Sequence, residues 1–234
     1  MNIRDDLNLL IKFSRYNLKI VFSNKFFYFL LAAFIFFLGV TAIILFSGDS
    51  DPDIADVYDL LLFPGILLIF YPTAFGIQND VDTRMIEILF GIPNYKYKVW
   101  ISRMALIWFI VFVFLVILTL LSMVAIVPVP LVQMVFQMMF PIFFLGCLSF
   151  MFSTLIRNGN GTAVVMVTIG MAFWIAAEPL SQSKWNIFLN PFNDHSNQAV
   201  WASTILKNRI YLSVGSILSM LYGMLNLQKR EKFI

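Results

Sequence analysis

Six long apolar stretches constrain this chain more than any other feature of its sequence. They cover residues 26–46, 57–78, 101–127, 131–156, 162–180 and 210–227. An α-helix needs about 20 mainly apolar residues to cross the roughly 30 Å hydrocarbon core of a bilayer. Only 12% of the residues are charged, whereas a soluble domain carries about 25% because its surface must be hydrated. The sequence therefore predicts an all-α membrane protein with six transmembrane helices.

The positions of lysine and arginine predict the orientation of these helices. With a cytoplasmic N-terminus, thirteen of the sixteen basic residues fall in cytoplasmic segments, and only Lys184, Lys207 and Arg209 fall outside. Basic residues accumulate in cytoplasmic loops. We therefore expect a multi-pass protein of a prokaryotic cytoplasmic (inner) membrane with both termini in the cytoplasm. Its basic residues are then expected to contact membrane lipid, and no nucleic-acid partner is expected.

Residues 1–25 precede the first span and carry polar residues at steps of four and three. These residues are Arg4, Asn8, Lys12, Arg15 and Lys19. Apolar residues occupy the opposite side, a pattern typical of an amphipathic helix that lies in the interface among anionic headgroups. The alternative is a positive anchor that only fixes topology. A single transmembrane domain, residues 26–234, is expected to follow.

The segment 181–209 between the last two spans is rich in aromatic residues. It includes Trp185, Phe188, Phe192 and Trp201. Aromatic residues at this density suit short helices that lie in the outer interface and pack on the bundle. We therefore expect an outer helical hairpin between spans five and six.

The segment 79–103 is the longest expected cytoplasmic connection. Residues 80–90 have acidic residues near their start and apolar residues after them, which predicts a short amphipathic helix, and Gly91 and Pro93 end it. A short helix with an apolar face, joined closely to two spans, suits docking of a soluble partner. The alternative is a solvated connection with one helical turn.

Within this segment, Glu87-Ile-Leu-Phe-Gly-Ile-Pro93 resembles the coupling helix of type-2, exporter-like ABC transporter permeases. Arg84-Met85-Ile86 stands where that family has Gly-Thr-Leu, which is a departure. Arg103 stands where the family has a basic residue at the start of the third span. The interfacial helix, the six spans, the coupling helix and the outer hairpin also follow the family's order.

The resemblance implies a permease subunit of an ATP-driven exporter. Such a chain forms the translocation path with a second copy or a homologous permease, and its 79–100 loop binds a separate nucleotide-binding ATPase subunit. ATP and magnesium would belong to that partner, because this chain has no phosphate-binding Gly-x-x-x-x-Gly-Lys-Ser/Thr stretch. The implied ATPase contacts are Asp82, Arg84, Met85, Glu87, Ile88, Leu89, Pro93 and Tyr95.

Four polar residues within or near the spans are candidates for the path or an outer gate: Glu178, Gln133, Gln137 and Asp59. Ionisable residues at membrane depth are costly and often functional. Alternatively, the two acids only reach the outer interface and the two glutamines only bond between helices.

The second hypothesis is a secondary carrier or an intramembrane enzyme that does not couple to ATP. His195 is the only histidine, so a site with two histidine ligands is impossible, and no metal site or cofactor is expected in the chain. The spans also hold no recognisable set of nucleophile and base, and no internal repeat. We therefore expect a transport subunit rather than an enzyme.

Overall fold

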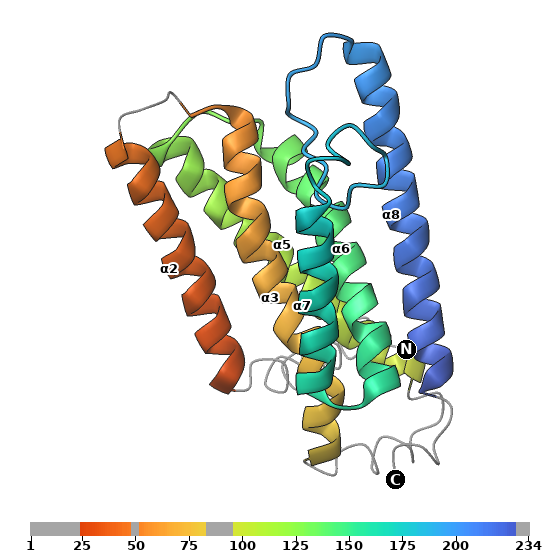
Figure 1. The fold of residues 1–234 in the computed structure, drawn as a ribbon. Helices are drawn as coiled ribbons and strands as arrows, with labels where there is room; N and C mark the ends of the chain where they lie inside the picture. Colours follow the sequence, from red (N-terminus) through yellow and green to blue (C-terminus); the bar gives the residue numbers. More distant parts are fainter. Residues whose placement is uncertain (1–23, 48–51, 83–95, 228–234) are drawn as a thin grey trace, which may run out of the picture.

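The computed structural model describes residues 24–47, 52–82 and 96–227. The regular secondary structure of this part of the chain is helical, and no strand occurs within it (Figure 1). Its elements are α2 (Asn24–Ser47), α3 (Ile54–Asp82), the π-helical turn η1 (Lys96–Ile101), α5 (Ser102–Ala125), α6 (Leu131–Ile156), α7 (Gly159–Ile175) and α8 (Gln198–Asn226).

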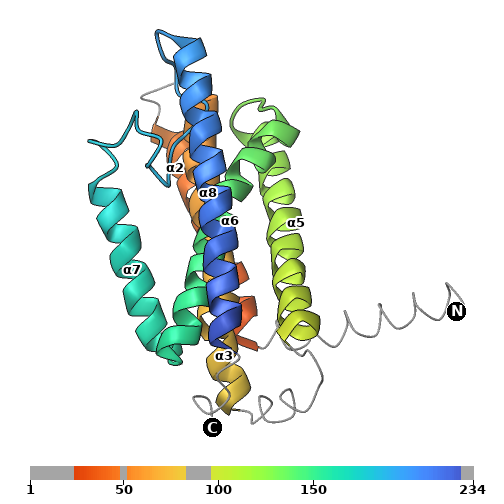
Figure 2. The same cartoon turned by 90° about the vertical axis from the view of Figure 1, so that its right-hand side faces the viewer.

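Successive long helices run in opposite directions, so the bundle has two distinct ends (Figures 1 and 2). One end holds the start of α2, the end of α3 and the last residues of α8, and we name it the Asp80 end. The other holds the start of α3, the start of α6 and the turns that precede α8, and we name it the Arg209 end.

In the described part of the chain, four helices are long and apolar enough to cross a membrane: Phe26–Phe46, Ile54–Asp82, Val99–Ala125 and Leu131–Ile156. The chain is therefore a multi-pass membrane protein. The remaining two helices depart from the expected spans. α7 is apolar but has 17 residues and ends at Ile175 rather than near residue 180. α8 has 29 residues and begins 12 residues before the expected sixth span.

The core of the bundle lies where α3 packs against α6, and small residues allow the close approach. A Cβ atom added to Gly146 of α6 would lie 2.6 Å from Cγ1 of Ile69 on α3. A Cβ on Gly65 of α3 would likewise overlap the side chain of Ile142. Small residues at such crossings bring helix backbones together and strengthen van der Waals packing, which is what associates helices in lipid.

The expected outer helical hairpin is wrong, because residues 176–197 form turns rather than helices. Asn186 Oδ1 accepts the backbone N–H of Phe188 at 2.9 Å, and Asn190 Oδ1 accepts that of Phe192 at 3.0 Å. Asparagine bonds of this kind favour turns and compete with helix formation. The segment still packs on the bundle, since Ile187 is buried.

The expected interfacial helix, over residues 1–25, lies almost wholly outside the described residues, which begin at residue 24. The same holds for the coupling helix, because residues 83–95 are outside them. Both remain predictions.

Candidate functional site

A buried ion pair joins the two helices that flank the predicted coupling segment. Asp80 lies in the last turn of α3 and Arg103 is the second residue of α5. Arg103 Nη1 lies 2.7 Å from Asp80 Oδ2, and each side chain is only 3% exposed. The Arg103 guanidinium also lies 4.6 Å from the ring centroid of Trp100. The pair therefore ties together the two ends of residues 81–102.

The same end of α3 is bonded to two further helices. Ser153 of α6 donates its hydroxyl to the carbonyl of Ala74 at 2.9 Å. The backbone N–H of Gly159, the first residue of α7, donates to Gln78 Oε1 at 2.5 Å. A Cβ on Gly159 would overlap the ring of Phe75, so only glycine fits this contact. The final turns of α3 are thus held by α5, α6 and α7 together.

α8 completes this end of the bundle through its contact with α6. Asn226 Nδ2 donates to the carbonyl of Thr154 at 2.6 Å. One turn earlier, Gly223 lies against the ring of Phe150, which in turn packs on Trp100 with ring centroids 5.5 Å apart. Trp100 precedes Arg103 by one turn, so this packing leads back to the ion pair. The Asp80 end is one connected set of contacts.

This arrangement is suited to fixing the relative positions of the helices rather than to catalysis. The carboxylate of Asp80 is occupied by a guanidinium, and neither side chain is accessible to a substrate. Within the described residues, no group of three or more His, Cys, Asp or Glu side chains could hold a metal ion. The site is best described as a structural contact that fixes α3 against α5, the two helices on either side of residues 83–95.

Of the predicted ATPase contacts, only Asp82 lies within the described residues. It is the last residue of α3 and is exposed, and Gln78 Nε2 lies 3.5 Å from its Oδ2. The other seven lie outside that part of the chain: Arg84, Met85, Glu87, Ile88, Leu89, Pro93 and Tyr95.

The four predicted path or gate residues lie at the Arg209 end. Glu178 is exposed in the turns after α7, Asp59 is exposed in the second turn of α3, and Gln133 is exposed in the first turn of α6. No hydrogen bond or ion pair among the described residues joins these side chains to one another. Gln137 differs, because it belongs to a buried polar network.

That network surrounds Arg209, which is only 5% exposed. Its Nε donates to Gln137 Oε1 at 2.8 Å and its Nη1 donates to Asn208 Oδ1 at 2.8 Å. Its Nη2 donates to Tyr58 Oη at 3.3 Å and to the carbonyl of Leu189 at 3.2 Å. All four acceptors are neutral, and they come from α3, α6, α8 and the preceding turns.

Sequence reasoning missed both buried networks as sites, although it named one member of each, Arg103 and Gln137. The available signals were modest: Asp80 and Arg103 carry opposite charges at either end of one connection, and Asn208-Arg209 directly precedes the last apolar stretch.

Comparison of the chain with models of known protein families, with curated proteins and with solved structures finds no match. A functional hypothesis must therefore rest on the sequence pattern and on the geometry of the two ends of the bundle.

Proposed function

We propose that this chain is the membrane-spanning permease subunit of an ATP-driven (ABC) exporter. In this proposal, the segment between Asp80 and Arg103 binds a separate nucleotide-binding ATPase subunit, which supplies the sites for ATP and magnesium. The chain forms the translocation path with a second copy or with a homologous permease. The Asp80 end faces the cytoplasm of a prokaryotic cell.

The observation that carries the proposal is the ion pair between α3 and α5, the helices that precede and follow the docking segment. A partner that displaces this segment acts on α3 and α5 together, because Asp80 and Arg103 join them. Separating a buried pair leaves an uncompensated charge, which costs about 3–5 kcal/mol. A displacement of the segment is therefore passed to the helices rather than absorbed at their junction.

The contacts around the pair offer a route for that displacement into the bundle. The end of α3 is bonded to α6 through Ser153 and to α7 through Gly159. ATP shifts a conformational equilibrium only if it binds one state more tightly than the other. The closed ATPase supplies that difference in this proposal, and the Asp80 end converts it into helix movement.

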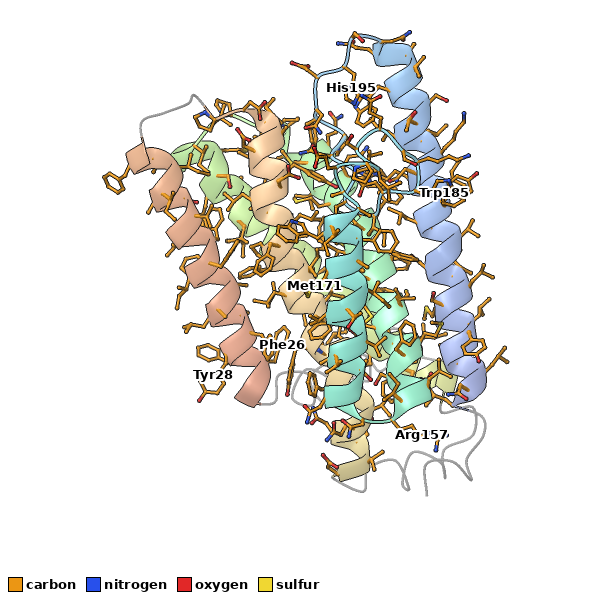
Figure 3. All side chains as sticks on the ribbon, viewed as in Figure 1. Phe26, Tyr28, Arg157, Met171, Trp185 and His195 are labelled. Carbon is orange, nitrogen blue, oxygen red and sulfur yellow. The ribbon has the colours of Figure 1, made fainter. Side chains whose placement is uncertain are left out.

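The outer faces of α2 and α7 are consistent with a second permease beside lipid. Both helices flank α3 (Figure 1), and most of their large apolar side chains are exposed. Examples on α2 are Tyr28 and Ile35, and examples on α7 are Val164 and Met171, the first and last of which Figure 3 labels. Apolar surface of this extent requires lipid or another membrane helix as its neighbour.

Co-purification with a matched pair of charge reversals tests the proposal. The tagged chain is extracted in mild detergent from its native cells, and the ATPase activity and stoichiometry of bound subunits are measured. Glu87→Arg should remove the ATPase subunit, because it reverses a charge in the proposed docking segment. Asp194→Arg is the control, since it reverses an acidic charge at an exposed site on the Arg209 end.

Recovery of the unaltered chain without any ATPase subunit would refute the proposal. Equal retention of an ATPase subunit by both variants would refute the assignment of the docking segment.

A further inference from the structure

α8 packs along α6, which is long and apolar enough to cross a membrane, and α8 is longer than such a crossing requires. Its 29 residues extend about 43 Å at about 1.5 Å per residue, whereas the hydrocarbon core is about 30 Å thick. A tilt of about 20° shortens its reach along the membrane normal by only about 3 Å. Part of the helix must therefore lie beyond the hydrocarbon.

The N-terminal turns of α8, and not its C-terminal turns, extend beyond the bundle. At the Asp80 end, Asn226 bonds to Thr154 of α6, so α8 ends level with its neighbour. At the Arg209 end, the first turns of α8 project past the ends of α3, α6 and α7 (Figures 1 and 2). The exposed residues of these turns include the polar Gln198, Ser203 and Lys207 beside the apolar Val200 and Leu206.

A lysine and two aromatic rings lie at the level of α8 below which its exposed residues are all apolar or aromatic. The rings of Trp185 and Tyr211 stack with centroids 4.6 Å apart, and both side chains are exposed. Lys184 Nζ lies 5.3 Å from each ring centroid. Figure 3 shows Trp185 beside α8, well below its first turns. Beyond Tyr211, toward the Asp80 end, the exposed residues of α8 are apolar or aromatic: Val214, Ile217, Leu218, Leu221, Tyr222 and Leu225.

We infer that Lys184, Trp185 and Tyr211 form a surface that binds phospholipid headgroups, so that residues 198–208 of α8 stand in water outside the membrane. Tryptophan and tyrosine concentrate at the headgroup level because one part of each ring is apolar and one part polar. The lysine, held over two rings, provides the positive charge that a headgroup phosphate requires.

This placement also explains how Arg209 is tolerated without a carboxylate. Arg209 lies two residues from Tyr211, on the side away from the bilayer centre. A cation at this depth avoids most of the cost of burial in hydrocarbon, and four neutral acceptors suffice to hold it. The first turns of α8 are themselves packed, since the ring centroids of Trp201 and His195 lie 3.8 Å apart.

Cysteine labelling tests the inference, because Cys147, the single native cysteine, is buried. Leu206→Cys and Ile217→Cys form a matched pair, since both replace exposed aliphatic residues of α8, 63% and 56% exposed. Each full-length variant is treated with a membrane-impermeant maleimide in right-side-out and in inverted vesicles. Leu206→Cys should react at least tenfold faster than Ile217→Cys, and the unaltered chain should not react.

A nitroxide attached to the same cysteines, and to Ile210→Cys beside the proposed headgroup surface, gives the depth directly. Collision with a water-soluble nickel complex should decrease in the order 206, 210, 217, and collision with oxygen should increase. Equal protection at 206 and 217 would place the first turns of α8 in the bilayer and overturn the inference. Neither readout requires an ATPase partner, so this result and the exporter proposal fail independently.

Discussion

Replacement of Asp80 by alanine is the sharpest test of the ion pair that connects α3 and α5. It leaves the Arg103 guanidinium buried beside Trp100 without the carboxylate that lies 2.7 Å from it. Among the described residues, Arg103 Nε already has no hydrogen-bond partner, so the site offers little compensation. Loss of one member of a buried pair costs about 3–5 kcal/mol. Since about 1.4 kcal/mol corresponds to a factor of ten, the folded-to-unfolded ratio should fall roughly 100- to 4,000-fold.

The measurement is the free energy of unfolding by sodium dodecyl sulfate titration in mixed micelles, made on a double-mutant cycle. Asp80→Ala, Arg103→Ala and the double variant are compared with the unaltered chain. The double variant removes both charges, so it should be more stable than the sum of the single effects predicts, by more than about 1 kcal/mol. Asp82→Ala changes an exposed acid two residues away and should shift stability by less than about 0.5 kcal/mol.

Two outcomes would refute the reasoning. The first is a cost for Asp80→Ala as small as that for Asp82→Ala. The second is simple additivity of the two single variants, which would mean that the carboxylate and the guanidinium do not stabilise one another.

Two further predictions use the same titration with a control in the same helix. Gly159→Ala should destabilise α7 by about 1–3 kcal/mol, because the new methyl group overlaps a ring of α3. Gly170→Ala adds a methyl group with nothing within 4 Å and should leave stability unchanged or raise it by up to about 1 kcal/mol. Arg209→Leu should cost about 2 kcal/mol or more, since buried acceptors lose their donor. Lys207→Leu, at an exposed position, should change little, and equal effects of these last two changes would contradict a structural role for the network.

The first four apolar stretches were predictable because the length of an apolar run is a local property of the sequence. Hydropathy marks the part of a helix that lies in lipid, however, and not where the helix begins. α8 begins at Gln198 because Asn197 Oδ1 accepts the backbone N–H of Val200 at 3.2 Å. The expected span began at residue 210, where the apolar stretch starts. The capping asparagine is visible in the sequence, but it falls within the segment 181–209 that is expected to form a hairpin.

The turns of residues 176–197 were missed for a related reason. Aromatic density in this segment indicated packing on the bundle, and Ile187 and Leu189 are indeed buried. It carried no information about backbone conformation, which Asn186 and Asn190 determine through bonds to the chain two residues later. Asparagine at that spacing was the better signal.

The partners within the two polar networks could not be read from the sequence. Pairing of Asp80 with Arg103 depends on how α3 and α5 are rotated about their axes, which no single segment specifies. Arg209 reaches acceptors on α3, α6 and α8 and in the turns, so its surroundings exist only once three helices and a loop have met. The sequence marks Gln137 as a polar residue within an apolar stretch, but its partner Arg209 lies 72 residues away.

The distribution of polar contacts also bears on how such a bundle could move. The hydrogen bonds between helices described above all lie at the two ends. In the middle of α8, the buried hydroxyl of Ser216 donates to the carbonyl of Leu212 in the same helix. Apolar packing is non-directional, so helices joined in this way can shift without breaking hydrogen bonds in the middle. Under the exporter proposal, a displacement at the Asp80 end would then pass along rigid helices to the Arg209 end, where the neutral acceptors around Arg209 can exchange at lower cost than an ion pair.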